Sequence, residues 1–281
     1  MTRICLLVLL AAAPASAQEG AAQPRPWTAG VNGGVTRLGP DLSQSFGGVT
    51  LARSFGANTI RIGATLFSGG DQFRQLRTTT RTSLFNLSYS RQIGVVTLEA
   101  HGALGSRSFR DQAVRLRSGN TVTVGGDGDI SSFGASIGAS FALAERWSLS
   151  PYAFVDRSRI DVARPVLGPG GRPVAEPLVQ RQSGTTGSLG LTLDRAIGPR
   201  SSLGLLAAFT ATSNSAAVTR FSGTGQRLLE GVGGSDGWLE FGAVGTVGLS
   251  DGLAIDLSLV STLGVAGGET LSGSAGIRAM F

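Results

Sequence analysis

The chain has 281 residues, of which 43 are glycine, 15% are charged and 41% are hydrophobic. It contains one cysteine and one histidine, so neither a disulfide framework nor a thiolate or histidine metal centre is expected. Disorder is not indicated, because the glycines lie among Val, Ile, Leu, Phe and Thr in runs with a period of two. The length allows one large domain or two small ones, and the composition favours a fold rich in β-strands.

The first element is an apolar leader. Arg3 supplies a positive charge, residues 4–13 form an apolar run, and Ala15 and Ala17 form a small-x-small cleavage pattern. This order is typical of a secretory signal peptide, and the run is too short for a helix that must span a bilayer with roughly 20 residues. We therefore predict export and cleavage just before Gln18.

Cleavage at this position divides the chain into three parts. We predict a removed signal peptide at 1–17, a short periplasmic segment at 18–26 and one barrel domain at 27–281. Cys5 leaves with the signal peptide, so the mature protein has no thiol.

Twelve segments after the leader alternate apolar and small or polar residues with the period of a β-strand. The predicted strands are 27–37, 46–54, 59–67, 81–90, 95–105, 130–143, 147–156, 182–195, 201–212, 238–249, 253–263 and 271–281. In each, one face is oily and the other is mostly Gly, Ser, Thr and Ala. An oily outer face around a cramped polar lumen predicts an all-β fold, a transmembrane antiparallel up-and-down β-barrel of about 12 strands.

The predicted connections alternate in length. Short turns follow the strands that end near 54, 90, 143, 195 and 249, and longer loops separate the others, including 68–80, 106–129 and 213–237. Outer-membrane barrels keep short turns in the periplasm and long loops outside, so both termini are expected to be periplasmic. The sequence thus predicts a multi-pass β-barrel in the outer membrane of a Gram-negative cell envelope.

Charged residues within the predicted strands fall on the small, polar face. A basic residue toward lipid costs roughly 2–4 kcal/mol at the bilayer midplane, so this placement supports the register. The residues predicted to face the lumen are Arg61, Glu99, His101, Asp194, Glu240, Asp256 and Arg278.

Arginines are concentrated in the predicted outer loops. Guanidinium groups pair with phosphate, so lipopolysaccharide is one expected partner beside the membrane lipid, and a merely solvated loop surface is the plainer interpretation. Nucleic-acid binding is not expected for loops outside the cell. The arginines concerned are Arg74, Arg77, Arg107, Arg110, Arg115, Arg117, Arg159, Arg164, Arg172, Arg220 and Arg227. Within the third loop, 114–117 and 121–124 flank Ser118-Gly-Asn120 and predict a projecting hairpin.

The chain ends as a strand with one oily face and a terminal aromatic residue. The pattern formed by Gly276, Ala279 and Phe281 resembles the C-terminal signal that outer-membrane proteins present to the barrel-assembly machinery. A final strand must also pair with the first to remove the free edge. We therefore expect the export and barrel-assembly machineries as partners during biogenesis.

About twelve strands and this ending resemble the β-domain of autotransporters. Trp147-Ser-Leu-Ser-Pro-Tyr-Ala-Phe154 looks like the strand of that family in which Pro-Tyr follows a short periplasmic turn. The family carries a passenger and a helical segment before its barrel, whereas 18–26 is too short for either. The resemblance therefore implies the barrel of a translocator without a passenger.

Catalytic and metal-binding motifs are weak. Gly134-Ala-Ser-Ile-Gly138 matches a nucleophile elbow but continues as a strand, and the histidine lies upstream instead of downstream. A surface Ser-His pair of the kind an outer-membrane phospholipase uses needs its histidine toward lipid, whereas His101 is predicted to face the lumen. Asp127 and Asp129 are too few for a calcium site. We predict no enzyme activity, no cofactor and no metal.

Two functions remain open. An 8-stranded barrel is filled by its side chains and a 16- to 18-stranded barrel holds a channel, so about 12 strands leave a slim lumen. The first hypothesis is a narrow passive pore or structural surface protein. The alternative is a translocator-type barrel for a separately encoded exported partner.

Overall fold

The computed structural model describes most of the chain after residue 25. The described residues are 4–5, 26–38, 42–73, 76–115, 118–119, 121–164, 166–167, 178–221, 225–229, 234–266 and 268–281. Within these ranges, no helical segment has both the length and the hydropathy that crossing a bilayer requires.

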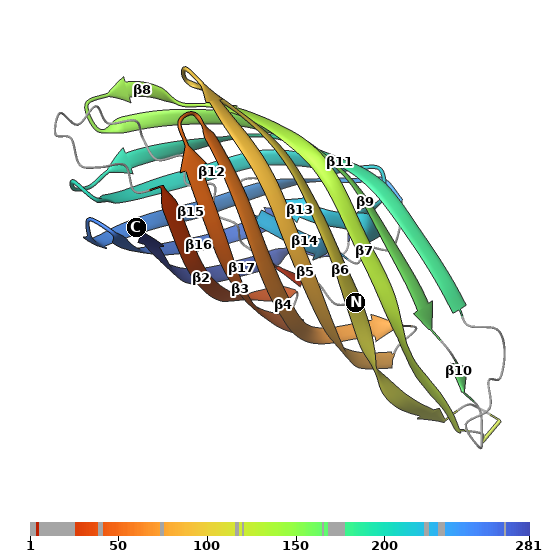
Figure 1. Cartoon of the computed structure of the whole chain (residues 1–281). Helices are drawn as coiled ribbons and strands as arrows, with labels where there is room; N and C mark the ends of the chain where they lie inside the picture. The colour runs from red at the N-terminus through yellow and green to blue at the C-terminus, as the bar shows by residue number, and fades with distance from the viewer. Residues whose placement is uncertain are drawn as a thin grey trace.

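Twelve antiparallel strands close into one barrel (Figure 1). In chain order the wall strands are β2 (Trp27–Leu38), β3 (Leu42–Phe55), β4 (Asn58–Phe73), β5 (Leu76–Ile93), β6 (Val96–Arg115), β7 (Thr121–Ala139) with its continuation β8 (Phe141–Ala144), β9 (Trp147–Arg164), β11 (Leu178–Ala196), β12 (Ser201–Thr212), β15 (Asp236–Ser250), β16 (Leu253–Leu263) and β17 (Thr270–Met280). A two-residue strand, β10 (Val166–Leu167), adds to β7. Because β17 pairs with β2 and β7 pairs with β9, the ring has no free edge. The predicted fold class is confirmed.

Strand boundaries match the sequence prediction best at the five short turns. β12 and β16 have the predicted bounds, whereas β6 has 20 residues and continues far into what the sequence analysis treats as a loop. The prediction of loops at 68–80 and 106–129 is therefore wrong, because most of these residues belong to strands. The predicted hairpin is confirmed, since Val114 pairs with Val122 and Arg115 with Thr121.

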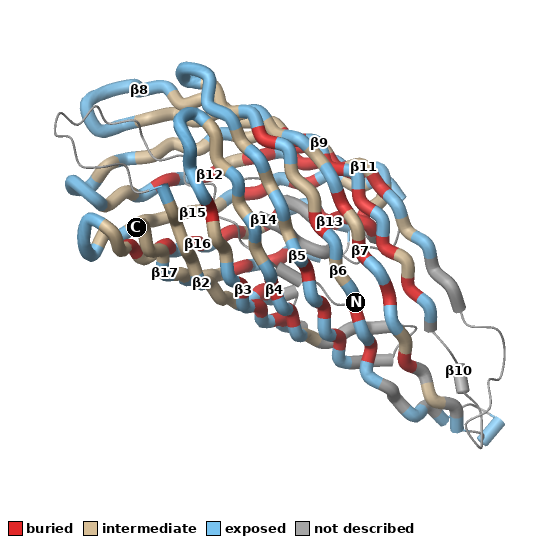
Figure 2. The backbone as a smooth tube through the Cα atoms, in the orientation of Figure 1, coloured by how far each residue is buried: buried red, intermediate tan, exposed pale blue. Residues whose placement is uncertain are grey.

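Along the wall strands, exposed residues alternate with more deeply buried ones (Figure 2). Toward the short turns the exposed residues are mostly apolar, and many of the buried ones between them are polar. On β16, Leu257 and Leu259 are 45% and 53% exposed, while Asp256 and Ser258 between them are buried. Other outward residues are equally apolar and exposed, including Phe85, Phe133 and Leu189. A continuous apolar exterior needs a lipid environment, because water would leave this whole surface unfavourably hydrated.

This alternation reverses toward the loop end of the long strands. On β9 the outward face changes from Val155 to exposed Arg157 and Arg159, while Ile160 and Val162 turn inward and are buried. A buried apolar cluster lines this part of the interior on six neighbouring wall strands, and it consists of Phe46, Phe67, Leu84, Phe109, Ile130, Ile160 and Val162. The expectation of a small, polar lumen therefore fails in this half, where the long strands project past the others (Figure 1).

The connection between β12 and β15 folds inward. It contains a short 3-10 helix, η2 (Ser215–Ala217), and the strands β13 (Val218–Phe221) and β14 (Gly225–Leu229). η2 and β13 contact β9 and β11, and Ala217 and Val218 are fully buried. β1 (Ile4–Cys5), from the predicted leader, pairs with β14. The prediction of an outer loop at 213–237 is therefore wrong for its described residues 213–221, which lie in the lumen.

Candidate functional site in the lumen

The candidate site is the lumen itself, and a charge cluster lies at its turn end. The Arg278 Nε and Nη2 atoms donate to the two oxygens of Asp256 at 2.9 and 3.0 Å, which makes the pair bidentate. Thr246 on β15 donates a third hydrogen bond to Asp256, at 2.7 Å. The cluster therefore joins β15, β16 and β17, and it satisfies a carboxylate that would otherwise be costly to bury.

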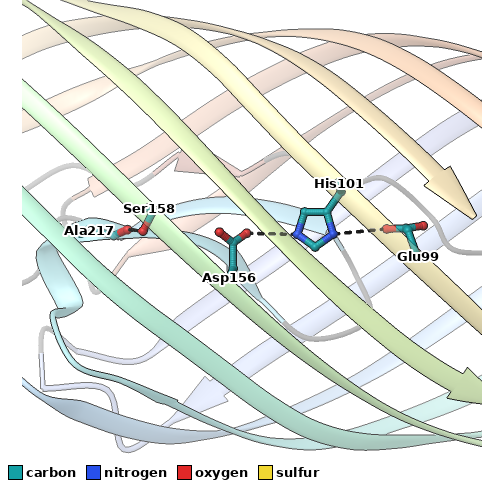
Figure 3. Close-up of polar contacts among 5 residues, drawn as sticks. All are labelled: Glu99, His101, Asp156, Ser158 and Ala217. Carbon is teal, nitrogen blue, oxygen red and sulfur yellow. Dashed lines mark hydrogen bonds and ion pairs between the residues drawn. The ribbon is translucent and has the colours of Figure 1, made fainter.

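A second cluster places His101 between two carboxylates (Figure 3). The His101 Nε2 atom lies 3.3 Å from an Asp156 oxygen, and the Nδ1 atom lies 3.6 Å from a Glu99 oxygen. All three side chains are at most 6% exposed. The imidazole therefore bridges β6 and β9 across β7, over Gly134, where a Cβ atom would lie within 2.7 Å of Nε2.

No described serine near this second cluster is arranged as a nucleophile beside the imidazole. The nearby hydroxyl of Ser158 donates to the main-chain carbonyl of Ala217, so it does not point at the imidazole as a nucleophile would. Gly134 and Ser136 lie inside β7, without the strand-turn-helix context of a nucleophile elbow. Among the described residues, no group of three potential ligands is placed to hold a metal ion.

A third cluster is centred on Glu240, which is fully buried on β15. The Trp238 Nε1 atom and the Thr210 hydroxyl donate to one Glu240 oxygen, at 2.9 and 3.0 Å. Thr210 also lies 2.9 Å from the Ser188 hydroxyl on β11. Hydroxyl and indole donors thus help to hold a carboxylate inside the barrel.

Hydroxyl pairs connect neighbouring strands on this side of the lumen. Each joins two inward side chains directly across a strand pair, at 2.5 to 3.1 Å: Thr36–Ser272, Thr186–Thr212, Ser258–Ser274 and Thr262–Thr270. Such pairs give the inner face its polarity at little cost in volume. The hydroxyls of these four pairs therefore have hydrogen-bond partners within the wall.

The inward-folded connection is attached to this wall by specific hydrogen bonds. Ser158 on β9 donates to the carbonyl of Ala217. The Asn214 amide nitrogen donates to the Gln182 side chain at 2.8 Å and to the Ser183 carbonyl at 3.1 Å. Val218 packs with Trp238 and Val265 in a buried apolar cluster. The connection is therefore part of the folded interior and occupies the lumen.

The structure places the other predicted lumenal residues as follows. Glu99, His101, Glu240, Asp256 and Arg278 belong to the three clusters, whereas Arg61 and Asp194 are half-buried near the turn end. Gly204 leaves room for the Asp194 carboxylate, which a Cβ atom would overlap. Asp156 and Ser158 are inward-facing residues that the sequence did not reveal. The prediction that Arg107 lies in an outer loop is wrong, because this residue is 1% exposed on β6, with its guanidinium carbon 4.9 Å from the centroid of the Phe109 ring.

The two ends of the barrel wall meet at the turn end. Trp27 and Phe281 exchange both main-chain hydrogen bonds at 3.0 Å, and Phe281 is 60% exposed. Gly276 and Ala279 lie on β17, opposite Asn32 and Ala29 of β2. The predicted cleavage residues Ala15, Ala17 and Gln18 lie outside the described residues.

An open hollow lies beside the C-terminus, between the β15–β16 turn and Phe281. Its acidic residue, Asp251, is exposed and paired with Arg200. This hollow has no buried titratable group, and it therefore gives no support to a catalytic function.

Two solved barrels from autotransporters have a fold similar to that of this chain. The translocator domain of the autotransporter NalP from Neisseria meningitidis matches with a TM-score of 0.71 and 13% identity, over 91% of this chain and 88% of that one. The β-domain of the Bordetella autotransporter BrkA matches with a TM-score of 0.59 and 17% identity, over 91% of this chain and 99% of that one. No family model and no curated protein matches the sequence.

The fold and its surface define the class of protein. A closed ring of twelve strands with an apolar exterior and a hydrogen-bonded interior is an outer-membrane β-barrel. At identities of 13% and 17% the likeness concerns the fold, and the resemblance to autotransporter β-domains is confirmed at that level.

Proposed function

We propose that the protein is a narrow passive pore whose lumen is closed at rest by its own β12–β15 connection. The carrying observation is the position of η2 and β13, which are buried against β9 and β11 inside the barrel. The lumen of a twelve-stranded barrel is slim, so a single short hairpin is large enough to obstruct it. A closed pore also keeps the envelope from leaking small solutes.

Hydrogen bonds at its base keep the connection in place. Ser158 and Gln182 contact it through their side chains, whereas both residues pair in the wall through their main chains, which a side-chain substitution leaves in place. Loss of these contacts should free the hairpin without opening the barrel. The proposed pore can therefore be opened separately from its scaffold.

Planar-bilayer recording tests this proposal. The wild-type protein should show rare or very small openings, and replacing residues 216–233 by a short Gly-Ser linker should produce a steady conductance. Slower gel migration after boiling than before would show that both proteins are folded barrels. Equal, negligible conductance in both would contradict a pore and favour a structural surface protein.

A translocator-type barrel for a separately encoded exported partner is the second candidate. The two similar solved structures favour it, because both are autotransporter barrels. An unstructured, epitope-tagged segment of passenger-like composition inserted after Gln18 provides a test. Cleavage of the tag by protease added to intact cells would support translocation, and full protection in a correctly assembled protein would contradict it.

The biogenesis we propose follows the sequence signals. The leader directs export, the barrel-assembly machinery receives the strand that ends at Phe281, and the short turns and both termini face the periplasm. The outer, arginine-bearing ends then face lipopolysaccharide, and no catalytic activity or cofactor is proposed. Phe281→Ser should reduce the assembled fraction severalfold, measured by heat-dependent gel migration of membrane extracts. Leu271→Ser, at the other end of β17, is the matched control and should assemble better.

A further inference from the structure

Two Trp–Arg pairs repeat on opposite sides of the barrel. Trp27 is the first residue of β2 and lies directly across from Arg53 on β3, with the guanidinium carbon 5.1 Å from the ring centroid. Trp147 is the first residue of β9 and lies directly across from Arg195 on β11, at 5.2 Å. Five wall strands separate β2 from β9 in either direction around the ring. The same arrangement thus occurs twice, half a turn of the ring apart.

Both pairs lie on the lipid-facing side, at the edge of the apolar exterior. Arg53 shares its outward face with Leu51 and Val49, and Arg195 shares its face with Leu193 and Leu191. Both arginines are exposed. An Arg at this level lies where the hydrocarbon ends and the headgroups begin, which is also where Trp is enriched.

Neither guanidinium has an anionic partner in the part of the chain that the structure describes. The contacts found for Arg53 and Arg195 there are with the tryptophan rings. Arg200, at the same end of the barrel, instead forms an ion pair with Asp251. Arg91 also lies exposed near the turn end of β5, while the exposed acidic residues at this end, Glu145 and Asp251, lie in the turns themselves. The two pairs therefore present planar, oriented cations without an internal counter-charge.

We propose that these two pairs bind the headgroups of anionic phospholipids in the leaflet at the turn end of the barrel. Stacking on the indole holds the guanidinium plane, and its free N–H groups can then donate to two oxygens of one phosphate. The glycerol and upper acyl chain would lie along Leu51 and Val49 at one site and along Leu193 and Leu191 at the other. Phosphatidylglycerol is favoured over phosphatidylcholine, because the choline of the latter already neutralises its phosphate. This inference is independent of whether the barrel is a pore or a translocator.

Native mass spectrometry of the full, delipidated barrel in detergent tests the proposal with phosphatidylglycerol and phosphatidylcholine as probes. The wild-type protein should retain two phosphatidylglycerol molecules in preference to phosphatidylcholine. Arg53→Gln and Arg195→Gln should each remove one, with a loss of affinity of about tenfold per site, as expected for one charge-assisted pair. Arg200→Gln is the matched control and should change neither the number nor the affinity.

Two further measurements test the contribution of the tryptophan rings and distinguish a bound lipid from free phosphate. Trp27→Leu with Trp147→Leu keeps both charges but removes the stacking, and it should weaken retention severalfold. Inorganic phosphate at millimolar concentration should not displace the lipid. The proposal is overturned if the double arginine variant, folded by the gel-migration criterion, retains the lipid as the wild type does. It is also overturned if Arg200→Gln lowers lipid retention as much as Arg53→Gln or Arg195→Gln does. Equal retention of phosphatidylglycerol and phosphatidylcholine, or displacement of the lipid by inorganic phosphate, would overturn it as well.

Discussion

The turn end and the loop end of the long strands obey opposite rules. Near the short turns, leucines such as Leu257 face outward while Asp256 and its neighbours are buried. Toward the loop end of β9, Arg159 is 58% exposed at its side chain while Ile160 is 4% exposed. One continuous strand can thus begin as a membrane strand and finish with the pattern of a water-soluble sheet.

The difference follows from the solvent outside each region. Lipid accepts apolar side chains, so the wall near the turns needs no apolar interior, and its interior is held by hydrogen bonds among buried polar groups. A transmembrane strand needs only about 9–11 residues, whereas β6 has 20. The remainder projects into water, where burial of apolar side chains supplies the stability.

The largest expected effect concerns the projecting half. Ile160→Ala should lower the free energy of unfolding by about 2–5 kcal/mol, because it leaves a cavity in the buried apolar cluster. The neighbouring Arg159→Ala should cost far less, since Arg159 forms an exposed, solvent-screened ion pair with Asp161. Urea unfolding in lipid vesicles, followed by tryptophan fluorescence, measures both. Equal losses of stability for the two variants would contradict the conclusion that apolar side chains face inward in this half of the barrel.

The next effect concerns the lipid-facing half. Leu257→Arg should cost about 2–4 kcal/mol if the residue lies near the bilayer midplane, because the guanidinium must enter hydrocarbon. Leu257→Ala separates this cost from the loss of apolar contact and should be milder. The same vesicle unfolding experiment applies. A cost for arginine no greater than for alanine would place this part of β16 outside the bilayer.

Sequence periodicity was sufficient to predict the wall near the turns, because there a single rule alternates every second residue. It placed the boundaries of β12 and β16 correctly and paired the final strand with the first. It failed where that rule changes along a strand. Arg107, for example, follows small residues and precedes Phe109, a local pattern that is typical of a loop. In the structure Arg107 is instead buried in a strand, with its guanidinium over the Phe109 ring.

The lumenal clusters were only partly predictable, for a different reason. Parity assigns Glu99, His101 and Asp256 to one face, but it contains no information on which strands lie opposite across the interior. Asp156 approaches His101 from another strand, 55 residues further along the chain. The inward path of residues 213–221 is likewise determined by packing against β9 and β11, which leaves no local pattern in the sequence.

A smaller effect tests the hydroxyl pairs of the polar interior. Thr262→Val should lower the free energy of unfolding by about 1 kcal/mol, because the buried Thr270 hydroxyl loses the partner that lies 2.9 Å away. Adding Thr270→Val should recover part of this cost, since both hydroxyls are then removed together, whereas the buried Thr270 main-chain N–H, which donates to the Thr262 hydroxyl at 3.1 Å, still loses that acceptor. The coupling between the two substitutions, measured by a double-mutant cycle, should be clearly non-zero. Additive costs would mean that the pair contributes little to the interior.

The mildest perturbation uses single cysteines to examine three environments. Ser258→Cys, on the polar inner face, should react readily with small water-soluble thiol reagents. Leu84→Cys, in the buried apolar cluster, should react more slowly with the same reagents. Leu259→Cys, on the outer face, should instead carry a fluorophore that quenchers in the acyl chains reach.

These three variants are interpretable only if the mature protein has no other thiol. Removal of the predicted leader would remove Cys5, so the unmodified mature protein should remain unlabelled under denaturing conditions. Labelling of that control would contradict the predicted cleavage before Gln18. With a silent control, equal reactivity at 84 and 258 would show that water fills the interior evenly from one end to the other. Lipid quenching at 258 as strong as at 259 would be more damaging, because two adjacent residues of one strand cannot both face the bilayer in a barrel wall.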